Sequence, residues 1–143
     1  MKTSDNGINL LIDFEGVELK AYPDSGGIWT IGIGTTVVNG VPVKQGDICT
    51  LSQAKDYMKK DLVWFETQLN NRLKVPVNQN QFDALILLWY NTGGSNTIVS
   101  MINSRTDLDI ISQWWQTHYI TAKGKVLRGL IMRRQKEAKL FTS

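Results

Sequence analysis

The stretch that decides the fold is residues 15–30, which read E-G-V-E-L-K-A-Y-P-D-S-G-G-I-W-T. An acid, Glu15, ends one predicted element, and a second acid, Asp24, follows in a turn. The stretch closes with Thr30 on a predicted strand. Two carboxyl groups and a hydroxyl in three different local settings therefore lie close together in the sequence, and the elements around them indicate what they do.

Glu15 falls on the apolar face of a predicted helix. Ile8, Leu11 and Ile12 recur at helical spacing, and Glu15 follows Ile8 by seven residues, on the same stripe. Gly16 supplies a helix stop. A carboxylate on a core-facing stripe is either partnered or desolvated, because surface glutamates occupy the opposite face. Desolvation raises the pKa of a carboxyl group, as a general acid working near neutral pH requires.

Asp24 and Thr30 have different surroundings. Residues 22–27 read Y-P-D-S-G-G, so Asp24 is expected in a tight, partly exposed turn where an acid stays ionised. Residues 28–35 read as a strand that alternates between two faces. One face carries Trp29, Ile31 and Ile33, and the other carries Thr30, Gly32 and Gly34. The second face is nearly bare, as expected where a ligand or another backbone approaches closely.

Two carboxyl groups with opposite environments beside a bare strand face are typical of glycoside hydrolases. One acid protonates the leaving oxygen, and the other acts on water or on the sugar carbon. The spacing alone leaves open the alternative that these residues have no catalytic role, because a glutamate, an aspartate and a threonine occur this close together by chance in most soluble proteins. Glu15 would then be a surface or salt-bridged residue.

Residues 14–36 resemble the catalytic region of phage-type lysozymes, the endolysins of double-stranded DNA bacteriophages. The resemblance extends to N-Q-N-Q-F-D-A-L at 78–85, Y-N-T-G-G at 90–94 and G-L-I-M-R-R-Q-K-E-A-K-L-F at 129–141. In that family a Glu, an Asp nine residues on and a Thr six further form the active-site triad. The matching positions are Glu15, Asp24 and Thr30. Supporting or substrate-binding roles are expected for Tyr22, Gly32, Gly34, Arg133 and Arg134.

One segment departs from the family pattern. Where the family usually reads G-Y-G-H-T after the catalytic threonine, this chain reads G-I-G-T-T at 32–36. Ile33 points to the core by alternation, so the loss of the tyrosine is a packing variation. Thr35 takes the place of the histidine, a change expected to affect pH dependence or local stability while leaving the triad positions intact.

The resemblance implies an α+β, lysozyme-like fold in a single catalytic domain, residues 1–143. A sheet lobe at about 15–48, a connecting helix at about 50–71 and a helical lobe at about 76–143 would flank a catalytic cleft. Local signals agree with this order. Asn39-Gly40 between valines predicts a hairpin, and Thr50 with Gln53 predicts a helix start. Asn78, Asp107 and the stripe at 127–141 predict the later helices.

The last predicted helix contains an inward-facing cation. Arg134 lies in the middle of the apolar stripe formed by Leu130, Ala138 and their neighbours, whereas Arg133 lies away from it. Burying an unpaired charge is costly, so Arg134 needs a carboxylate partner. Glu15 and Asp13 are the candidates.

Composition excludes several classes of site. The single cysteine, Cys49, cannot form an internal disulfide and suggests a reducing compartment. The single histidine, His118, has no partners at metal-ligand spacing, so no metal site is expected. The hydrolysis favoured below requires no cofactor. Core packing is the favoured role of Trp114 and Trp115, with sugar stacking as the alternative. The N-terminal segment resembles neither a signal peptide nor a membrane span.

The net charge of +3 is unevenly placed. Residues 118–143 hold seven Lys and Arg against one acid, Glu137, whereas the rest of the chain has a net charge of −3. Such a basic segment is typical of a protein that binds an anionic polymer such as peptidoglycan. Contact with an anionic envelope surface is the second interpretation. Nucleic acid is not expected, since no zinc-finger spacing, helix-turn-helix or aromatic platform is present. Stable membrane insertion is not expected either.

The favoured function is hydrolysis of the β-1,4 bond between N-acetylmuramic acid and N-acetylglucosamine in peptidoglycan. Glu15 would protonate the glycosidic oxygen, Asp24 would activate water or stabilise the oxocarbenium-like centre, and Thr30 would position the water. Because the resembled family includes inverting members, inversion is expected. The alternatives are a wall-binding module without turnover and a lytic transglycosylase. A monomer is expected. The resemblance further implies that the protein accumulates in the host cytoplasm until lysis and then acts in the periplasm.

Overall fold

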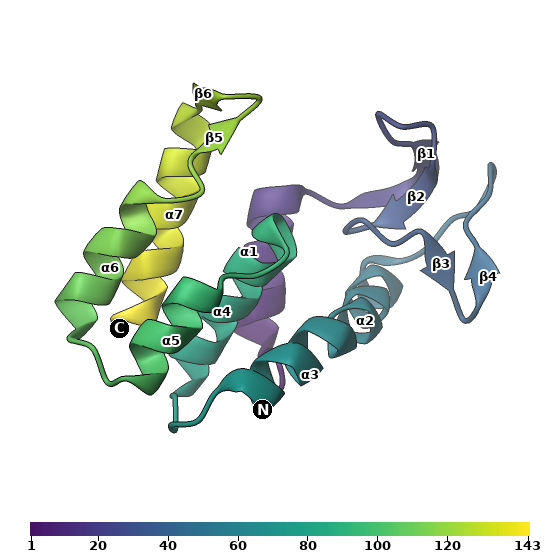
Figure 1. Cartoon of the computed structure of the whole chain (residues 1–143). Helices are drawn as coiled ribbons and strands as arrows, with labels where there is room; N and C mark the ends of the chain where they lie inside the picture. The colour runs from purple at the N-terminus through teal and green to yellow at the C-terminus, as the bar shows by residue number, and fades with distance from the viewer. The chain divides into compact units, whose positions relative to one another are not determined.

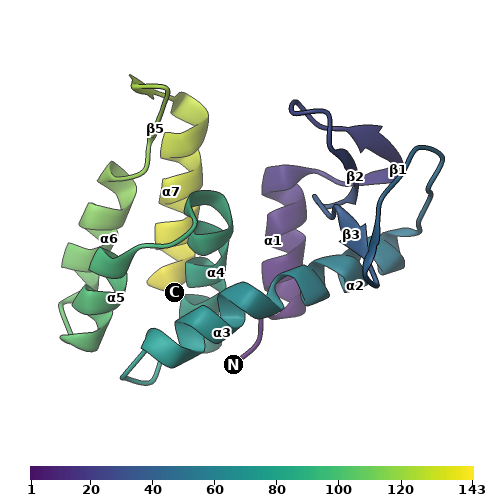
Figure 2. The same cartoon turned by 45° about the vertical axis from the view of Figure 1, so that its right-hand side comes forward.

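The structure is a computed structural model that describes residues 1–143 (Figures 1 and 2). The chain divides into two compact units. The first, here called the helical unit, contains residues 1–7 and 64–143, and the second, the sheet unit, contains residues 8–63. The sheet unit is therefore inserted, in sequence, into the helical unit. Whether the chain acts as one domain stays a prediction.

The sheet unit consists of short strands between two helices. In chain order its elements are α1 (Asp5–Glu15), β1 (Glu18–Pro23), β2 (Trp29–Gly32), β3 (Val37–Val38), β4 (Val41–Pro42) and α2 (Leu51–Asp61), with α1 starting in the helical unit. The strands form two antiparallel pairs, β1 with β2 and β3 with β4. Asn39 and Gly40 both have positive φ, 50° and 80°, as the predicted hairpin turn requires.

A small apolar core holds these strands together. Ala21, Ile31 and Val43 are buried, with Trp29 and Cys49 among the partly buried side chains packed on them. Burial raises the pKa of the Cys49 thiol, so the thiol stays protonated and packs as a small apolar side chain. The core fixes β2, the strand that carries Thr30.

The predicted connecting helix is two helices. α2 begins after Thr50, which forms the expected capping box with Gln53, and ends at Asp61. α3 (Val63–Arg72) follows. The single residue between them, Leu62, is fully buried, and its N–H is shared between the carbonyls of Lys60 and Met58. The apolar stripe continues through this residue, so the periodicity could not reveal the interruption.

The helical unit is built around α4. Its elements after α3 are α4 (Gln79–Thr92), α5 (Asn96–Asn103), α6 (Leu108–Thr117), β5 (Thr121–Ala122), β6 (Lys125–Val126) and α7 (Arg128–Phe141). Residues 82–89 of α4 are all buried, so α4 is the central helix of this unit. α7 packs against both α4 and α6 (Figures 1 and 2). The β5–β6 hairpin between α6 and α7 was not predicted.

Helix caps in this unit follow the sequence closely. Asn78 and Gln81 form a capping box at the start of α4, and Gly93 ends α4 in the left-handed conformation with φ 85°. Asp107 caps α6 by accepting a hydrogen bond from Asp109 N. Each cap is decided by residues within one turn, which is why the sequence predicted them.

The first residues of the chain are tied to the helical unit. The amide and hydroxyl of Thr3 both donate to Glu66 Oε2 at 2.7 Å. The amide and hydroxyl of Ser4 donate to Asp83, which is buried on α4. The N-terminal ammonium group donates to Asn70 Oδ1 at 2.9 Å. None of the helices combines the length and the apolar character that a membrane span needs.

Candidate active site

Glu15 is the last residue of α1. The helix stops where predicted, because Gly16 takes a φ of 77° and its N–H donates to Ile12 O at 2.7 Å. The side chain of Glu15 is exposed, whereas Ile8 and Leu11 on the same stripe are buried. Of the two alternatives for Glu15, desolvation is therefore wrong, and a partnered carboxylate stays a prediction. The apolar stripe runs into the last turn of the helix, where the packed core has already ended.

Asp24 occupies the tight, partly exposed turn that the sequence predicted. Its Oδ1 accepts hydrogen bonds from Gly26 N at 2.8 Å and Ile28 N at 2.9 Å. The backbone closes the same turn, since Asp24 N donates to Ile28 O at 2.9 Å. The carboxylate is thereby fixed by one oxygen, and Oδ2 makes no hydrogen bond within the protein. A carboxylate held in this way keeps one oxygen available for a water molecule or a ligand.

Thr30 lies on β2 and is almost fully buried, with 4% of its surface exposed. Its hydroxyl donates to Ile28 O at 2.9 Å, so the lone pairs of Oγ1 remain available to accept a hydrogen bond. Tyr22 of β1 stands directly opposite Thr30 in the strand pair, which places the two side chains on one face. Ile28 thus connects both candidate residues, through its N–H to Asp24 and through its carbonyl to Thr30.

Gly32 is required by its surroundings. A Cβ at this position would meet Ala54 Cβ of α2 at 3.2 Å, and the residue has a φ of 69°. The nearly bare face of the strand is therefore explained, at Gly32, by close approach of another helix. Gly34 also has a positive φ, 115°, in the turn that links β2 to β3. Both glycines shape the backbone beside Thr30.

Thr35, which stands where the resembled family has a histidine, is buried with 1% of its surface exposed. Its hydroxyl donates to Asp61 Oδ2 at 2.6 Å, near the end of α2. Burial raises the pKa of Asp61, and the hydrogen bond from Thr35 opposes that shift. The threonine thus supplies the donor that a partly buried carboxylate needs.

Arg134 does not pair with Glu15 or Asp13. It is fully buried on α7, where its Nη1 donates to Glu137 Oε1 at 2.7 Å and its Nη2 donates to Asn91 Oδ1. The need for a carboxylate partner was predicted correctly, but the partner is three residues away on the same helix. Arg134 Nε has no hydrogen-bond partner in the protein.

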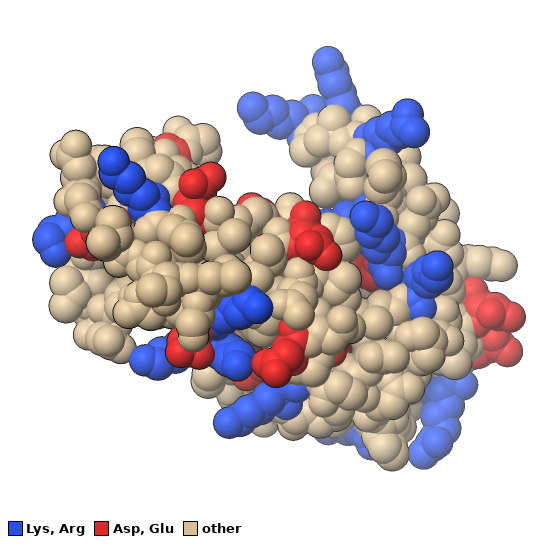
Figure 3. All heavy atoms as spheres, turned by 180° about the vertical axis from the view of Figure 1, so that it is seen from behind, with Lys and Arg blue, Asp and Glu red and all other residues tan.

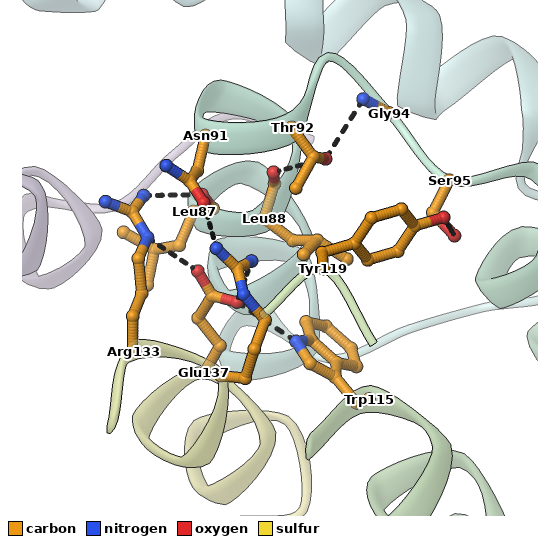
Figure 4. A network of polar contacts seen from close by, with 11 residues as sticks. Leu87, Leu88, Asn91, Thr92, Gly94, Ser95, Trp115, Tyr119, Arg133 and Glu137 are labelled. Carbon is orange, nitrogen blue, oxygen red and sulfur yellow. Dashed lines mark hydrogen bonds and ion pairs between the residues drawn. The ribbon is translucent and has the colours of Figure 1, made fainter. Parts of the chain in front are cut away.

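Arg133 is also buried, so its predicted place away from the core is wrong. Its Nε donates to Glu137 Oε2 at 3.0 Å and its Nη2 donates to Leu87 O at 2.8 Å (Figure 4). Trp115 Nε1 donates to Glu137 Oε1 at 3.1 Å. Burial raises the pKa of Glu137 and lowers the pKa of Arg134, while the attraction between the two charges opposes both shifts. The network joins α4, α6 and α7.

Glu137, Asn91 and Trp115 are the network residues that sequence reasoning missed. Glu137 lies four residues after Arg133 and three after Arg134, the spacing at which helical side chains meet. That spacing was a usable signal. The contact with Asn91 joins residues 43 positions apart and depends on how α4 and α7 pack.

No group of three or more His, Cys, Asp or Glu side chains in the chain is arranged to hold a metal ion. His118 stacks on Trp114 with 3.8 Å between ring centroids, and its Nδ1 lies 2.7 Å from Trp114 O. Both rings lie at the end of α6, with His118 exposed and Trp114 half-buried. Trp115, by contrast, is a core residue.

Comparisons with known proteins cover nearly the whole chain. The family described as Phage lysozyme matches residues 12–137. The endolysin of Salmonella phage P22 is 38% identical over 151 residues, covering 100% of this chain and 99% of the relative. A crystal structure of a P22 lysozyme mutant gives a TM-score of 0.90 at 34% identity, covering 100% of this chain and 99% of that chain. The endolysin from Escherichia coli O157:H7 phage FAHEc1 gives 0.81 at 38% identity, with coverages of 99% and 93%.

Proposed function

The chain belongs to the phage lysozyme family, and from this premise we propose that Glu15, Asp24 and Thr30 are the catalytic residues of a muramidase. The predicted α+β fold of the lysozyme type and the predicted family are confirmed. The protein is a phage endolysin that degrades peptidoglycan and so lyses the host cell. The proposed reaction is hydrolysis of the β-1,4 bond between N-acetylmuramic acid and N-acetylglucosamine.

The hydrogen bonds of Asp24 and Thr30 are the observation that supports this proposal. Asp24 Oδ1 is held by two backbone N–H groups, so Oδ2 is the oxygen available to take a proton from water. The hydroxyl of Thr30 donates its hydrogen bond to Ile28 O, so it can only accept a hydrogen bond from that water. A water that donates to both residues has a free lone pair for the anomeric carbon. Glu15, at the exposed end of α1, would protonate the leaving oxygen.

Because Asp24 Oδ2 and Thr30 Oγ1 can both accept hydrogen bonds from one water, we propose that Asp24 acts as the general base and that the anomeric carbon is inverted. Inverting enzymes seat a water between carboxyl groups about 6.5–9.5 Å apart, whereas retaining enzymes bring them to about 5–5.5 Å. Proton NMR of the first product to form identifies its anomer. An initial α-anomer is expected, and an initial β-anomer would establish retention.

The central test is loss of turbidity by outer-membrane-permeabilised Gram-negative cells. Wild-type protein should clear them, and Glu15→Gln should not, at equal concentrations of protein with the same circular dichroism. Asp13→Asn is the matched control, because Asp13 is an exposed acid on the same helix and makes no hydrogen bond. Equal activity of Glu15→Gln and wild type would refute the assignment of Glu15.

Two alternatives predict different products. A wall-binding module without turnover would pellet with purified wall and release no reducing sugar. A lytic transglycosylase would release anhydro sugars in place of reducing ends, since it does not use water. Mass spectrometry of the released fragments separates all three. The proposed water contacts of Asp24 and Thr30 support hydrolysis.

Further proposals concern the setting of the enzyme. We expect a monomer, checked by gel filtration with light scattering, and accumulation in the host cytoplasm until lysis, checked by fractionation of expressing cells. A weak contact with the anionic envelope is expected from the basic C-terminal helix α7, whose first residue, Arg128, is exposed beside Lys123 and Lys125 of the β5–β6 hairpin. Lys and Arg side chains project from this end of the helical unit (Figure 3). Sedimentation with anionic vesicles tests that contact.

A further inference from the structure

An open hollow of about 490 Å³ lies on the helical unit, where the end of α3 meets α5. Its volume falls within the range of about 300–1,000 Å³ that small-molecule sites occupy. α5 contributes residues at 96, 99, 100 and 103, which share one face at helical spacing. The residues that line the hollow, here called the amide groove, are Asn71, Arg72, Lys74, Asn96, Val99, Ser100, Asn103 and Ser104.

Hydrogen bonds fix the walls of the amide groove. Asn103 Oδ1 accepts from Lys74 N at 2.8 Å, and Asn103 Nδ2 donates to Arg72 O at 2.9 Å. One amide side chain thus clamps the turn after α3 against α5. Arg72 Nη1 donates to Asn96 Oδ1 at 2.8 Å, which holds the guanidinium group over the groove. A ligand would therefore meet polar groups that are already oriented.

Much of the hydrogen-bonding capacity of the amide groove faces solvent. The ammonium group of Lys74 has no ion pair, and the side chains of Asn71, Ser100 and Ser104 make no hydrogen bond within the protein. Residues 67–82 and 84–106 contain no aspartate or glutamate. The residues that line the groove accordingly offer two cations, amides and hydroxyls and include no carboxylate.

We propose that the amide groove binds a muropeptide segment of the wall other than the segment that is being cut. The proposal rests on the proposed function, because it assumes that the substrate is peptidoglycan. Acetamido groups and stem-peptide amides pair with asparagine side chains, and stem-peptide carboxylates pair with Arg72 and Lys74. A second contact with the same polymer raises the local concentration of substrate without any change in the chemical step.

Nucleic acid fits the groove less well. The groove has cations for a phosphate backbone, but its lining contains no aromatic side chain on which a base could stack. A neutral sugar fits less well for a different reason, since it would leave Arg72 and Lys74 without an anionic partner. A ligand that carries both amides and carboxylates can pair with the two cations and with the polar side chains that make no hydrogen bond within the protein.

Binding is tested by ¹H–¹⁵N NMR of the full chain titrated with the muropeptide N-acetylglucosaminyl-N-acetylmuramyl-tetrapeptide. The glycosidic bond in this disaccharide joins C1 of N-acetylglucosamine to N-acetylmuramic acid, whereas a muramidase cuts the bond at C1 of N-acetylmuramic acid. The ligand is therefore not cleaved during the titration. Amide signals of residues 71–74 and 96–104 should shift. Lys74→Gln, which removes an exposed and unpaired charge, should weaken binding about threefold, and R72Q/K74Q about tenfold, as expected for exposed charge contacts.

Two controls separate this site from general attraction of anions. K123Q/K125Q makes the same change in charge on the β5–β6 hairpin and should leave the groove titration unchanged. The neutral sugar chitotetraose should not shift the groove signals. Absence of shifts at saturating muropeptide would overturn the proposal. So would unchanged affinity of R72Q/K74Q, an equal loss in K123Q/K125Q, or displacement of the muropeptide by a short DNA strand.

Kinetics separate this proposal from the proposed function. On intact sacculi, R72Q/K74Q should raise KM about fivefold and leave kcat within twofold of wild type, since none of Glu15, Asp24 and Thr30 lines the groove. If wild type digests sacculi but muropeptide does not shift the groove signals, only the groove proposal fails. If the signals shift and wild type releases no reducing ends, the muramidase proposal fails and the groove stands as a wall-binding site.

Discussion

Replacing Thr35 with valine tests how this chain accommodates the loss of the histidine seen in related lysozymes. Valine has nearly the shape of threonine, so Thr35→Val removes the hydroxyl without creating a cavity. The change removes the 2.6 Å hydrogen bond to Asp61 Oδ2. Hydrogen bonds to charged groups contribute about 1.5–3 kcal/mol. Because Asp61 is half-buried and partly reached by water, we expect a loss near the lower end, about 1.5–2 kcal/mol.

The loss should depend on pH in a defined direction. Burial raises the native pKa of Asp61 above its ordinary value of 3.8, and the Thr35 hydroxyl opposes that shift. The native state therefore favours the protonated acid, and this contribution to stability is present below pH 3.8 and lost as pH rises through the native pKa. Without the hydroxyl the native pKa rises further. Thr35→Val should consequently be more destabilised at pH 7 than at pH 3.5.

Urea unfolding of wild type and Thr35→Val at both pH values measures the effect, and thermal unfolding should show a shift of about 5 °C at pH 7. Thr35→Val combined with Asp61→Asn is the control, because the carboxylate is then absent and the pH dependence should disappear. A loss of equal size at both pH values, or one that persists in the double variant, would show that Thr35 acts through packing and not through Asp61.

Three further predictions concern other parts of the molecule. Glu137→Gln removes the carboxylate that both buried arginines contact and should cost about 3–5 kcal/mol in chemical unfolding, with no rescue by salt. Gly32→Ala forces a Cβ to 3.2 Å from Ala54 at a positive φ and should cost about 1–2 kcal/mol, whereas Gly27→Ala, with the same sign of φ but open space, should cost less. Asp24→Asn keeps an oxygen for both backbone N–H groups, so the melting temperature should stay within a few degrees while kcat falls about 10²–10⁴-fold.

The features predicted correctly from sequence are those decided by near neighbours. The capping boxes at Thr50 and Asn78, the hairpin at Asn39-Gly40 and the turn of Asp24 all depend on residues within a few positions. Such contacts form wherever the chain adopts that local conformation. The placement of Thr30 on a strand beside a packed apolar face belongs to the same class.

The wrong predictions required knowledge of packing. Periodicity placed Glu15 on the core stripe but could not show that the core ends one turn earlier. Periodicity also placed Arg133 away from the core, whereas its side chain is buried and donates a hydrogen bond to Leu87 O on α4. The β5–β6 hairpin was missed because its strands have two residues each and its turn holds Lys123 with a φ of 52°, a conformation that lysine seldom adopts.

The attachment of the first four residues to Glu66, Asn70 and Asp83 has a consequence for synthesis on the ribosome. Residues 8–63 leave the exit tunnel as one continuous segment and can begin to fold while the rest is still being made. Residues 1–7 must wait for partners more than sixty positions downstream. A bulky fusion at the N-terminus would therefore hinder the last step of assembly, and a fusion at the exposed C-terminal Ser143 is the better choice for labelling the protein.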